Sequence, residues 1–211
     1  MNYHIDLHSA RRGFTLIELL VVIAIIAILA AMGFGAGALA IDKARRVHAL
    51  SDCSNLVQGI QAFYDDYNSL PDVPDAATPP GVKTEADLMD VLVGFEKGDE
   101  IQNSKGIRYY KGRDAKGSQS NAERAFGGLF ITDAGEPSAE LLDPWRKIGS
   151  ENRHYYVMMD LDYDEELEDP FRTDKILYGR LAIAWCTGKD GKFSTSSEKD
   201  STNRDNVHSW K

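Results

Sequence analysis

The sequence lacks the residue patterns on which most enzymes and nucleic-acid-binding proteins depend. Its five histidines are scattered along the chain, and there is neither a His-Glu-x-x-His pair nor a glycine-rich phosphate loop. Acidic residues outnumber basic ones by 33 to 24, so the formal charge of −9 leaves no basic surplus for binding nucleic acid. These absences predict a protein that is not an enzyme and has no nucleic-acid partner.

Cysteine is nearly absent as well. The chain contains two cysteines, Cys53 and Cys186, which are too few for the disulfide framework of a small secreted domain. One disulfide between them and two buried thiols are both compatible with the sequence. Seven prolines and 18 glycines are ordinary numbers for a globular chain and give no sign of extensive disorder.

Charge is missing from one long stretch near the N-terminus. From Phe14 to Ile41 only Glu18 is charged, and at about 1.5 Å per residue roughly 20 helical residues span a bilayer's hydrocarbon core. A cleaved secretory signal has an apolar core about half as long. A simple membrane anchor has the right length but leaves Glu18 unexplained. Because a charge at membrane depth costs at least about 2.5 kcal/mol, Glu18 is a functional candidate that needs a partner.

The segment Gly13-Phe14-Thr15-Leu16-Ile17-Glu18-Leu19 resembles the processing site of type IV prepilins and type II secretion pseudopilins. The resemblance implies that prepilin peptidase cleaves between Gly13 and Phe14, which makes residues 1–13 a leader peptide, and then methylates the new amine of Phe14. It also implies that Glu18 of one subunit pairs with this amine in a neighbour. The same two groups lie about one helical turn apart within one subunit, so an internal contact is the alternative.

Apolar residues continue at helical spacing beyond the uncharged stretch, and the pattern ends at Asn68-Ser69-Leu70-Pro71. This predicts one helix from Phe14 to about Tyr67, apolar all round over 14–41 and amphipathic over 42–67. The rest of the chain divides into a loop and short-helix insertion at 68–125, an antiparallel sheet at 126–186 and a C-terminal loop at 187–211. We therefore expect a pilin-like α+β fold, in which the long helix packs on a small sheet.

Shorter elements are predicted from local patterns. Thr84-Glu85-Ala86-Asp87 resembles a capping box at the start of a short helix that reaches about Phe95. Asp143-Pro144-Trp145 resembles the segment that introduces the sheet in major pseudopilins, and we expect Asp143 to cap a turn. Runs of β-branched and aromatic residues predict strands at Ile107–Tyr110, Phe126–Thr132, His154–Asp160 and Ile176–Cys186.

The segment from Cys186 to Trp210 resembles the end of the major pseudopilin, where an Asp-Gly turn and a later aspartate before Ser-Trp close around calcium. The resemblance implies Asp190 and Asp205 as side-chain ligands and Thr187 as a carbonyl ligand. Asp200 and Glu198 are further candidates. Calcium takes about six to eight oxygen ligands, which such a loop can supply, while a solvated loop without a metal is the alternative.

A second acidic segment has alternating carboxylates at Asp160, Asp162 and Asp164. In an EF-hand loop, glycine would stand where Glu165 is and glutamate where Phe171 is. This segment is therefore predicted to be an acidic turn and not a metal site.

Taken together, the resemblance implies a structural subunit of a periplasmic pseudopilus that helps drive type II protein secretion. The precursor would cross the inner membrane once, with its N-terminus in the cytoplasm and its C-terminal domain in the periplasm. Its partners would be further copies of itself, prepilin peptidase, minor pseudopilins and the inner-membrane assembly platform. One alternative is a subunit of a type IV surface pilus that serves adhesion, motility or DNA uptake. The other is a membrane-anchored, calcium-dependent exported enzyme, and no catalytic grouping supports it.

Overall fold

The structure is a computed structural model that describes residues 14–117, 122–132, 135–145, 150, 152–197 and 200–210, without the side chains of residues 32–36 and 173. The predicted leader at residues 1–13, including Gly13, and the candidate ligand Glu198 lie outside the described residues. The chain divides into two compact units, Met1–Lys43 and Ala44–Lys211. Each unit is described by itself.

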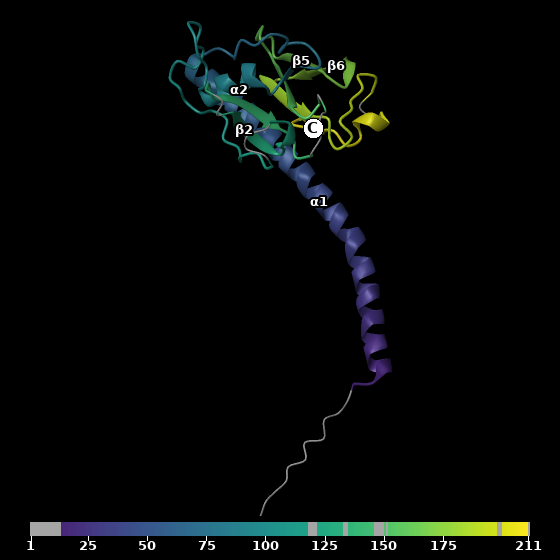
Figure 1. The fold of residues 1–211 in the computed structure, drawn as a ribbon. Helices are drawn as coiled ribbons and strands as arrows, with labels where there is room; N and C mark the ends of the chain where they lie inside the picture. The colour runs from purple at the N-terminus through teal and green to yellow at the C-terminus, as the bar shows by residue number, and fades with distance from the viewer. Residues whose placement is uncertain are drawn as a thin grey trace, which may run out of the picture. The chain divides into compact units, whose positions relative to one another are not determined.

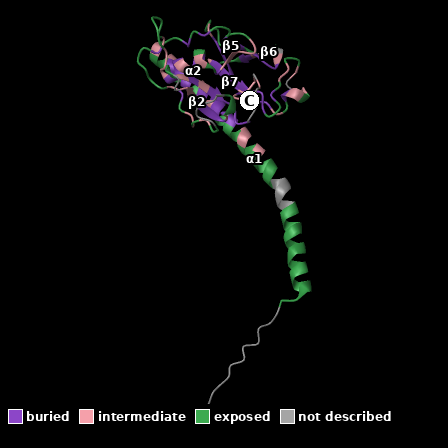
Figure 2. Ribbon diagram, viewed as in Figure 1, coloured by how far each residue is buried: buried purple, intermediate pink, exposed green. Residues whose placement is uncertain are grey.

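One helix, α1, runs from Leu16 to Tyr67 and contributes residues to both units (Figure 1). Its 52 residues confirm the long helix predicted from the apolar spacing, with a start two residues later than predicted. In the first unit, the apolar side chains of α1 are exposed in the single chain (Figure 2). Among the helical residues whose side chains the structure describes, none forms a span with the length and hydropathy needed to cross a membrane.

The second unit is built around a four-stranded antiparallel sheet in the order β1-β4-β7-β8. These strands are β1 (Val82–Lys83), β4 (Tyr155–Met159), β7 (Ala182–Cys186) and β8 (Val207–His208). Two antiparallel hairpins accompany the sheet: β2 (Gly128–Thr132) with β3 (Ser138–Leu142), and β5 (Glu166–Asp169) with β6 (Arg172–Tyr178). The remaining helices are α2 (Ala86–Val93) and the 3-10 turns η1 (Ala122–Arg124) and η2 (Ser201–Asn203). This arrangement is the expected α+β fold.

Both faces of the central strands are buried. The buried residues of α1 recur at steps of three and four along its second half: Ala49, Cys53, Leu56, Ile60 and Phe63. They share one cluster with α2 and with alternate residues of the strands, and we call this cluster the helix-side core. The intervening strand residues, among them Tyr156 and Trp185, face a second cluster with Phe171 and Trp210, the hairpin-side core. Alternation along the strands explains why every residue of β4 and β7 is buried.

The predicted capping box at Thr84 is wrong. Helix α2 begins at Ala86 after Glu85, whose side chain makes no capping hydrogen bond. Thr84 is fully buried, and its hydroxyl donates to the carbonyl of Leu141 (2.8 Å) and accepts from the backbone N–H of Tyr155 (3.0 Å). Its hydroxyl therefore bridges β3 and β4, and tertiary packing overrides the local pattern.

The strands predicted at Phe126–Thr132 and His154–Asp160 are confirmed by β2 and β4, and the other two strand predictions differ from the structure. Ile107–Tyr110 forms no strand; the N–H groups of Tyr109 and Tyr110 donate to the carbonyl of Leu92 at the end of α2 (2.8 and 3.0 Å). The predicted strand over 176–186 is split, because a turn at Gly179, with φ of +67°, separates β6 from β7. The expected turn at Asp143 is confirmed, since its carboxylate accepts from the N–H of Trp145 (3.0 Å).

Asp52 is an ionisable residue of α1 that is buried against the sheet. Asp52 of α1 accepts a hydrogen bond from the Tyr155 hydroxyl (2.8 Å) and lies 3.5 Å from the Arg113 guanidinium. Burial raises the pKa of Asp52, and this outweighs the hydrogen bond from Tyr155 and the positive charge of Arg113, which lower it. The folded state therefore holds this proton more tightly than the unfolded state does.

We predict that Asp52→Asn makes the folded state less sensitive to pH. Because the pKa of Asp52 is raised on folding, its favourable contribution is complete below the unfolded pKa of about 3.9 and is lost as pH rises through the folded pKa. Urea unfolding of the full chain in detergent, measured from pH 4 to 7, should show a smaller loss of stability for the variant than for the wild type. Identical pH dependence of the two proteins would contradict this role for Asp52.

Candidate functional site

The first candidate site is the N-terminal end of α1. Thr15 and Glu18 form reciprocal hydrogen bonds there: the carboxylate of Glu18 accepts from the backbone N–H of Thr15 (2.8 Å), and the Thr15 hydroxyl accepts from the N–H of Glu18 (3.3 Å). This is a capping box, which satisfies two donors that the first turn of a helix would leave without partners. Thr-x-x-Glu before an apolar run is its sequence signature, so the capping role of Thr15, which was not predicted, is visible in the sequence.

The capping box leaves Glu18 able to accept from a further donor. Both the backbone N–H and the hydroxyl of Thr15 donate to Oε2 of Glu18, each at 2.8 Å, and Oε1 takes neither bond. A carboxylate accepts hydrogen bonds at both oxygens. Glu18 can therefore hold the first turn of α1 and still accept from an ammonium group. Phe14, which would carry that group after cleavage, lies next to Thr15 and is exposed.

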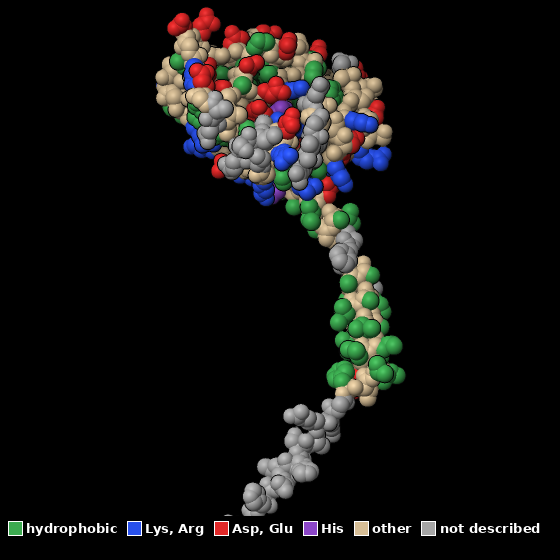
Figure 3. Space-filling view, viewed as in Figure 1, with side chains coloured by type: hydrophobic (Ala, Val, Ile, Leu, Met, Phe, Trp, Pro, Cys, Tyr) green, Lys and Arg blue, Asp and Glu red, His purple; other side chains and the backbone are tan. Residues whose placement is uncertain are grey.

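Apolar side chains surround α1 directly after this cap, as Figure 3 shows. The large apolar residues between Leu16 and Leu29 are 43–87% exposed in the single chain. Monomeric soluble proteins rarely expose a contiguous apolar surface of this kind, and such a surface marks contact with lipid or with other chains. The segment thus combines one carboxylate with a helix surface that requires an apolar environment.

The second candidate site is the C-terminal loop. Asp205 accepts hydrogen bonds from the N–H groups of Lys189 (2.6 Å) and Asp190 (3.0 Å), and Asp190 accepts from the N–H of Lys192 (2.9 Å). Glycine at position 188 allows the backbone there to lie close to Asp205. A Cβ at Gly188 would lie 2.2 Å from the carbonyl oxygen of Asp205, and its φ of +60° also favours glycine. The structure therefore brings Asp190 and Asp205 together at one turn.

The other expected ligands have different roles. The carbonyl of Thr187 faces the side-chain amide of Asn206, whose nitrogen donates to it at 3.1 Å in the orientation that satisfies its neighbours. Asp200 accepts from the N–H of Thr202 (3.0 Å) and caps η2. Thr187 thus belongs to the same loop as Asp190 and Asp205, while the carboxylate of Asp200 serves a local turn.

The Ser-Trp segment anchors the chain end to the sheet. The Ser209 hydroxyl accepts from the N–H of Ala184 (3.0 Å), and the Ser209 N–H donates to the Ala184 carbonyl (2.9 Å). Trp210 stacks on Phe171 in the hairpin-side core, with ring centroids 5.7 Å apart. These contacts hold β8 beside β7 and so position Asp205, which lies just ahead of β8.

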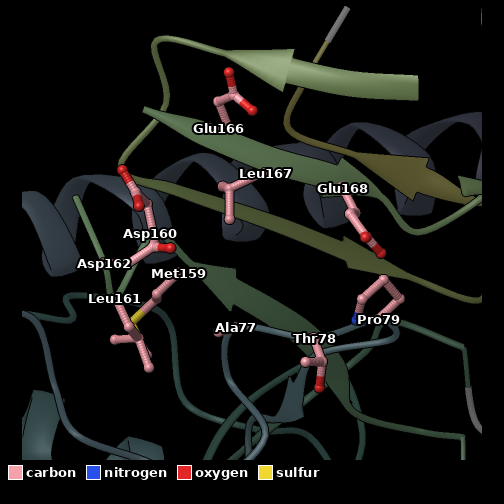
Figure 4. A pocket seen from close by; sticks show the side chains of 10 residues that line it. All are labelled: Ala77, Thr78, Pro79, Met159, Asp160, Leu161, Asp162, Glu166, Leu167 and Glu168. Carbon is pink, nitrogen blue, oxygen red and sulfur yellow. The ribbon is translucent and has the colours of Figure 1, made fainter. Parts of the chain in front are cut away.

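Within the described parts of the chain, the one place where at least three acidic, histidine or cysteine ligand atoms converge is Asp160, Asp162 and Asp164, within 4.8 Å of one another. Asp160 and Asp162 lie at one end of a cavity of about 340 Å³, with Glu168 beside Pro79 farther along its lining (Figure 4). The buried carboxylate of Asp160 accepts from the N–H groups of Asp164 (3.2 Å) and Glu165 (2.9 Å). Backbone N–H groups therefore donate to both carboxylate oxygens of Asp160, as expected of an acidic turn.

Comparison with protein families matches residues 8–34 to the prokaryotic N-terminal methylation motif. No curated protein and no solved structure shows significant similarity to the chain. The matched residues include Gly13, Phe14 and Glu18, and the motif implies processing by prepilin peptidase and assembly into polymers. The motif thus supports a type IV pilin-like protein, and the N-terminal helix packed with an antiparallel sheet is consistent with a pilin-like fold.

Proposed function

We propose that the chain is a structural subunit of a type II secretion pseudopilus. Prepilin peptidase would cleave it between Gly13 and Phe14 and methylate the amine of Phe14. The observation that carries this proposal is the methylation motif on an apolar helical segment whose one carboxylate, Glu18, keeps an oxygen for a further donor. The role is mechanical and not catalytic, which agrees with the lack of a nucleophile–base motif in the sequence.

Two environments would suit the first half of α1. In the precursor, lipid would cover its apolar surface, and the sequence from Phe14 to Ile41 has the length for this. In the filament, the same surface would pack against the helices of other copies. Cleavage would give Phe14 an ammonium group, and pairing with Glu18 of a neighbour would neutralise two charges in apolar surroundings. This pairing would disfavour any helix packing in the wrong register.

Location and partners follow from the same proposal. The subunit would begin as a single-pass inner-membrane protein, with Ala44–Lys211 in the periplasm, and would move into a periplasmic filament. Its partners would be other copies, prepilin peptidase, minor pseudopilins and the assembly platform of the inner membrane. Subunits of type IV surface pili have the same motif, so the choice of the pseudopilus rests on the Asp-Gly and Ser-Trp features of residues 186–210.

We predict that Glu18→Gln distinguishes the capping role of Glu18 from the role of its negative charge. Glutamine also completes a capping box, so this variant keeps the first turn of α1 but loses the negative charge. Cleavage after Gly13 should be retained, while filament yield should fall at least about tenfold, the effect of losing roughly 1.4 kcal/mol per contact. Filaments sheared from cells and quantified by immunoblot provide the measurement.

Thr15→Val is the matched variant, because it removes the hydroxyl of the cap and keeps the carboxylate. If the charge pair controls assembly, Thr15→Val should retain more filament than Glu18→Gln. A normal filament yield from Glu18→Gln would refute the pairing between subunits.

We further propose that calcium binds the C-terminal loop. Support comes from the convergence of Asp190 and Asp205, each of which accepts backbone N–H groups at one carboxylate oxygen and has a second oxygen for a cation. Carboxylate and carbonyl oxygens are the ligands that calcium prefers, and the Thr187 carbonyl lies in the same loop. Asp200 caps η2 through Oδ1 and remains a further candidate in the same loop.

Asp190→Ala should therefore abolish the effect of calcium on thermal stability. We expect calcium to raise the thermal midpoint of the full chain by several degrees relative to chelator, because it binds the folded state alone. The variant should show no such shift, and Asp162→Ala, in the other acidic segment, should keep it. Equal destabilisation by Asp190→Ala with calcium and with chelator would identify a plain turn. Loss of the shift in Asp162→Ala would place the ion elsewhere.

A further inference from the structure

Two cysteines that are distant in sequence meet in the helix-side core. Cys53 lies on α1 and Cys186 is the last residue of β7, and both are completely buried thiols within the unit Ala44–Lys211. Both belong to the same cluster of core side chains. Neither has a role in the proposed assembly or calcium sites.

The strand register places Cys186 in the middle of a row of three residues. It is paired with Tyr155 of β4 on one side and with Val207 of β8 on the other. All three side chains belong to the helix-side core. The row therefore runs across three adjacent strands on the face that α1 covers.

Helix α1 contacts this row at both of its ends through two consecutive residues. The carboxylate of Asp52 accepts from the hydroxyl of Tyr155 (2.8 Å), and the sulfur of Cys53 lies 4.0 Å from the carbonyl oxygen of Val207. Because Cys186 sits between Tyr155 and Val207, this crossing places Cys53 beside Cys186. Burial raises the pKa of the Cys53 thiol, and the neighbouring Cys186 raises it further, which agrees with their proximity.

We propose that Cys53 and Cys186 form a disulfide that joins α1 to β7. The proposal rests on the proposed function in one respect, because export would bring this unit into an oxidising compartment. One cysteine thiolate attacks the disulfide of an external oxidant, which releases one thiolate and leaves a mixed disulfide on the protein. The second cysteine thiolate then attacks the protein sulfur of this mixed disulfide and displaces the oxidant's other thiolate. Two S–H bonds are lost and one S–S bond forms, while the oxidant's disulfide is reduced to two thiols that take up the two protons.

Burial determines when this reaction takes place. A thiol with no exposed surface and a raised pKa presents almost no thiolate to an oxidant. The disulfide would therefore form while the domain folds, when α1 first docks on the sheet and the sulfurs are still accessible. Once formed, it would be equally protected from reduction.

The cross-link would stabilise the helix on its sheet. It closes a loop of more than 100 residues, so the unfolded chain loses much of its freedom. We expect the thermal midpoint of the oxidised chain to exceed that of the reduced chain by on the order of 10 °C.

The test is oxidative refolding of the full chain in detergent. Reduced, unfolded protein is diluted into buffer with oxidised and reduced glutathione. The reaction is quenched with an alkylating agent, and the mass of the intact chain is measured by mass spectrometry. We expect a product lighter by two hydrogens that carries no alkyl group. The same mixture kept in denaturant should give mainly glutathione adducts, because the native contact is absent.

Single variants control for the pairing. Cys53→Ser and Cys186→Ser should each yield a chain with one remaining thiol or glutathione adduct. Two alkyl groups on the refolded wild-type chain would overturn the proposal, and so would equal disulfide yields under native and denaturing conditions. The oxidant is supplied in vitro, so this outcome does not depend on whether the chain forms a pseudopilus. Failure of filament assembly in cells would leave the mass result unchanged.

Discussion

A carboxylate near the start of an apolar helical segment is the constraint on which the proposed processing and assembly of this protein depend. Glu18 needs hydrogen-bond donors wherever α1 is placed, because a charge in apolar surroundings is costly. In the uncleaved chain Thr15 supplies two donors from within the same turn. Cleavage at Gly13 would create a further donor, the ammonium group of Phe14. Glu18 can thus cap α1 in the uncleaved chain and would pair with the Phe14 amine of a neighbour in the filament.

The remainder of the molecule is organised by the second half of α1. Its stripe of buried residues covers one face of the central sheet, and the β5–β6 hairpin with the C-terminal tryptophan covers the other. The two halves of this helix therefore differ: the apolar side chains of the first half are exposed in the single chain, whereas the second half packs in the core of its own domain. Within this half, Asp52 and Cys53 contact the sheet directly, at Tyr155 and Val207.

The long helix, the processing motif and the central strands could be predicted because each is encoded in contiguous, periodic sequence. The misses have physical causes. Thr84 has the local pattern of a cap, but its hydroxyl bridges two strands that are distant in sequence. The acidic strand β5 has little intrinsic β-propensity and exists through its pairing with β6. The cap that Asp200 forms on η2 was not predicted, because it depends on the conformation of the folded loop.

The N-terminus of the mature chain tests the central claim most directly. Intact mass spectrometry of the protein from its native membranes, followed by fragmentation, locates both the first residue and any methyl group. The account predicts a chain that lacks residues 1–13 and carries one methyl group on the amine of Phe14. A mature chain that begins at another residue, or an unmethylated chain that begins at Phe14, would contradict it.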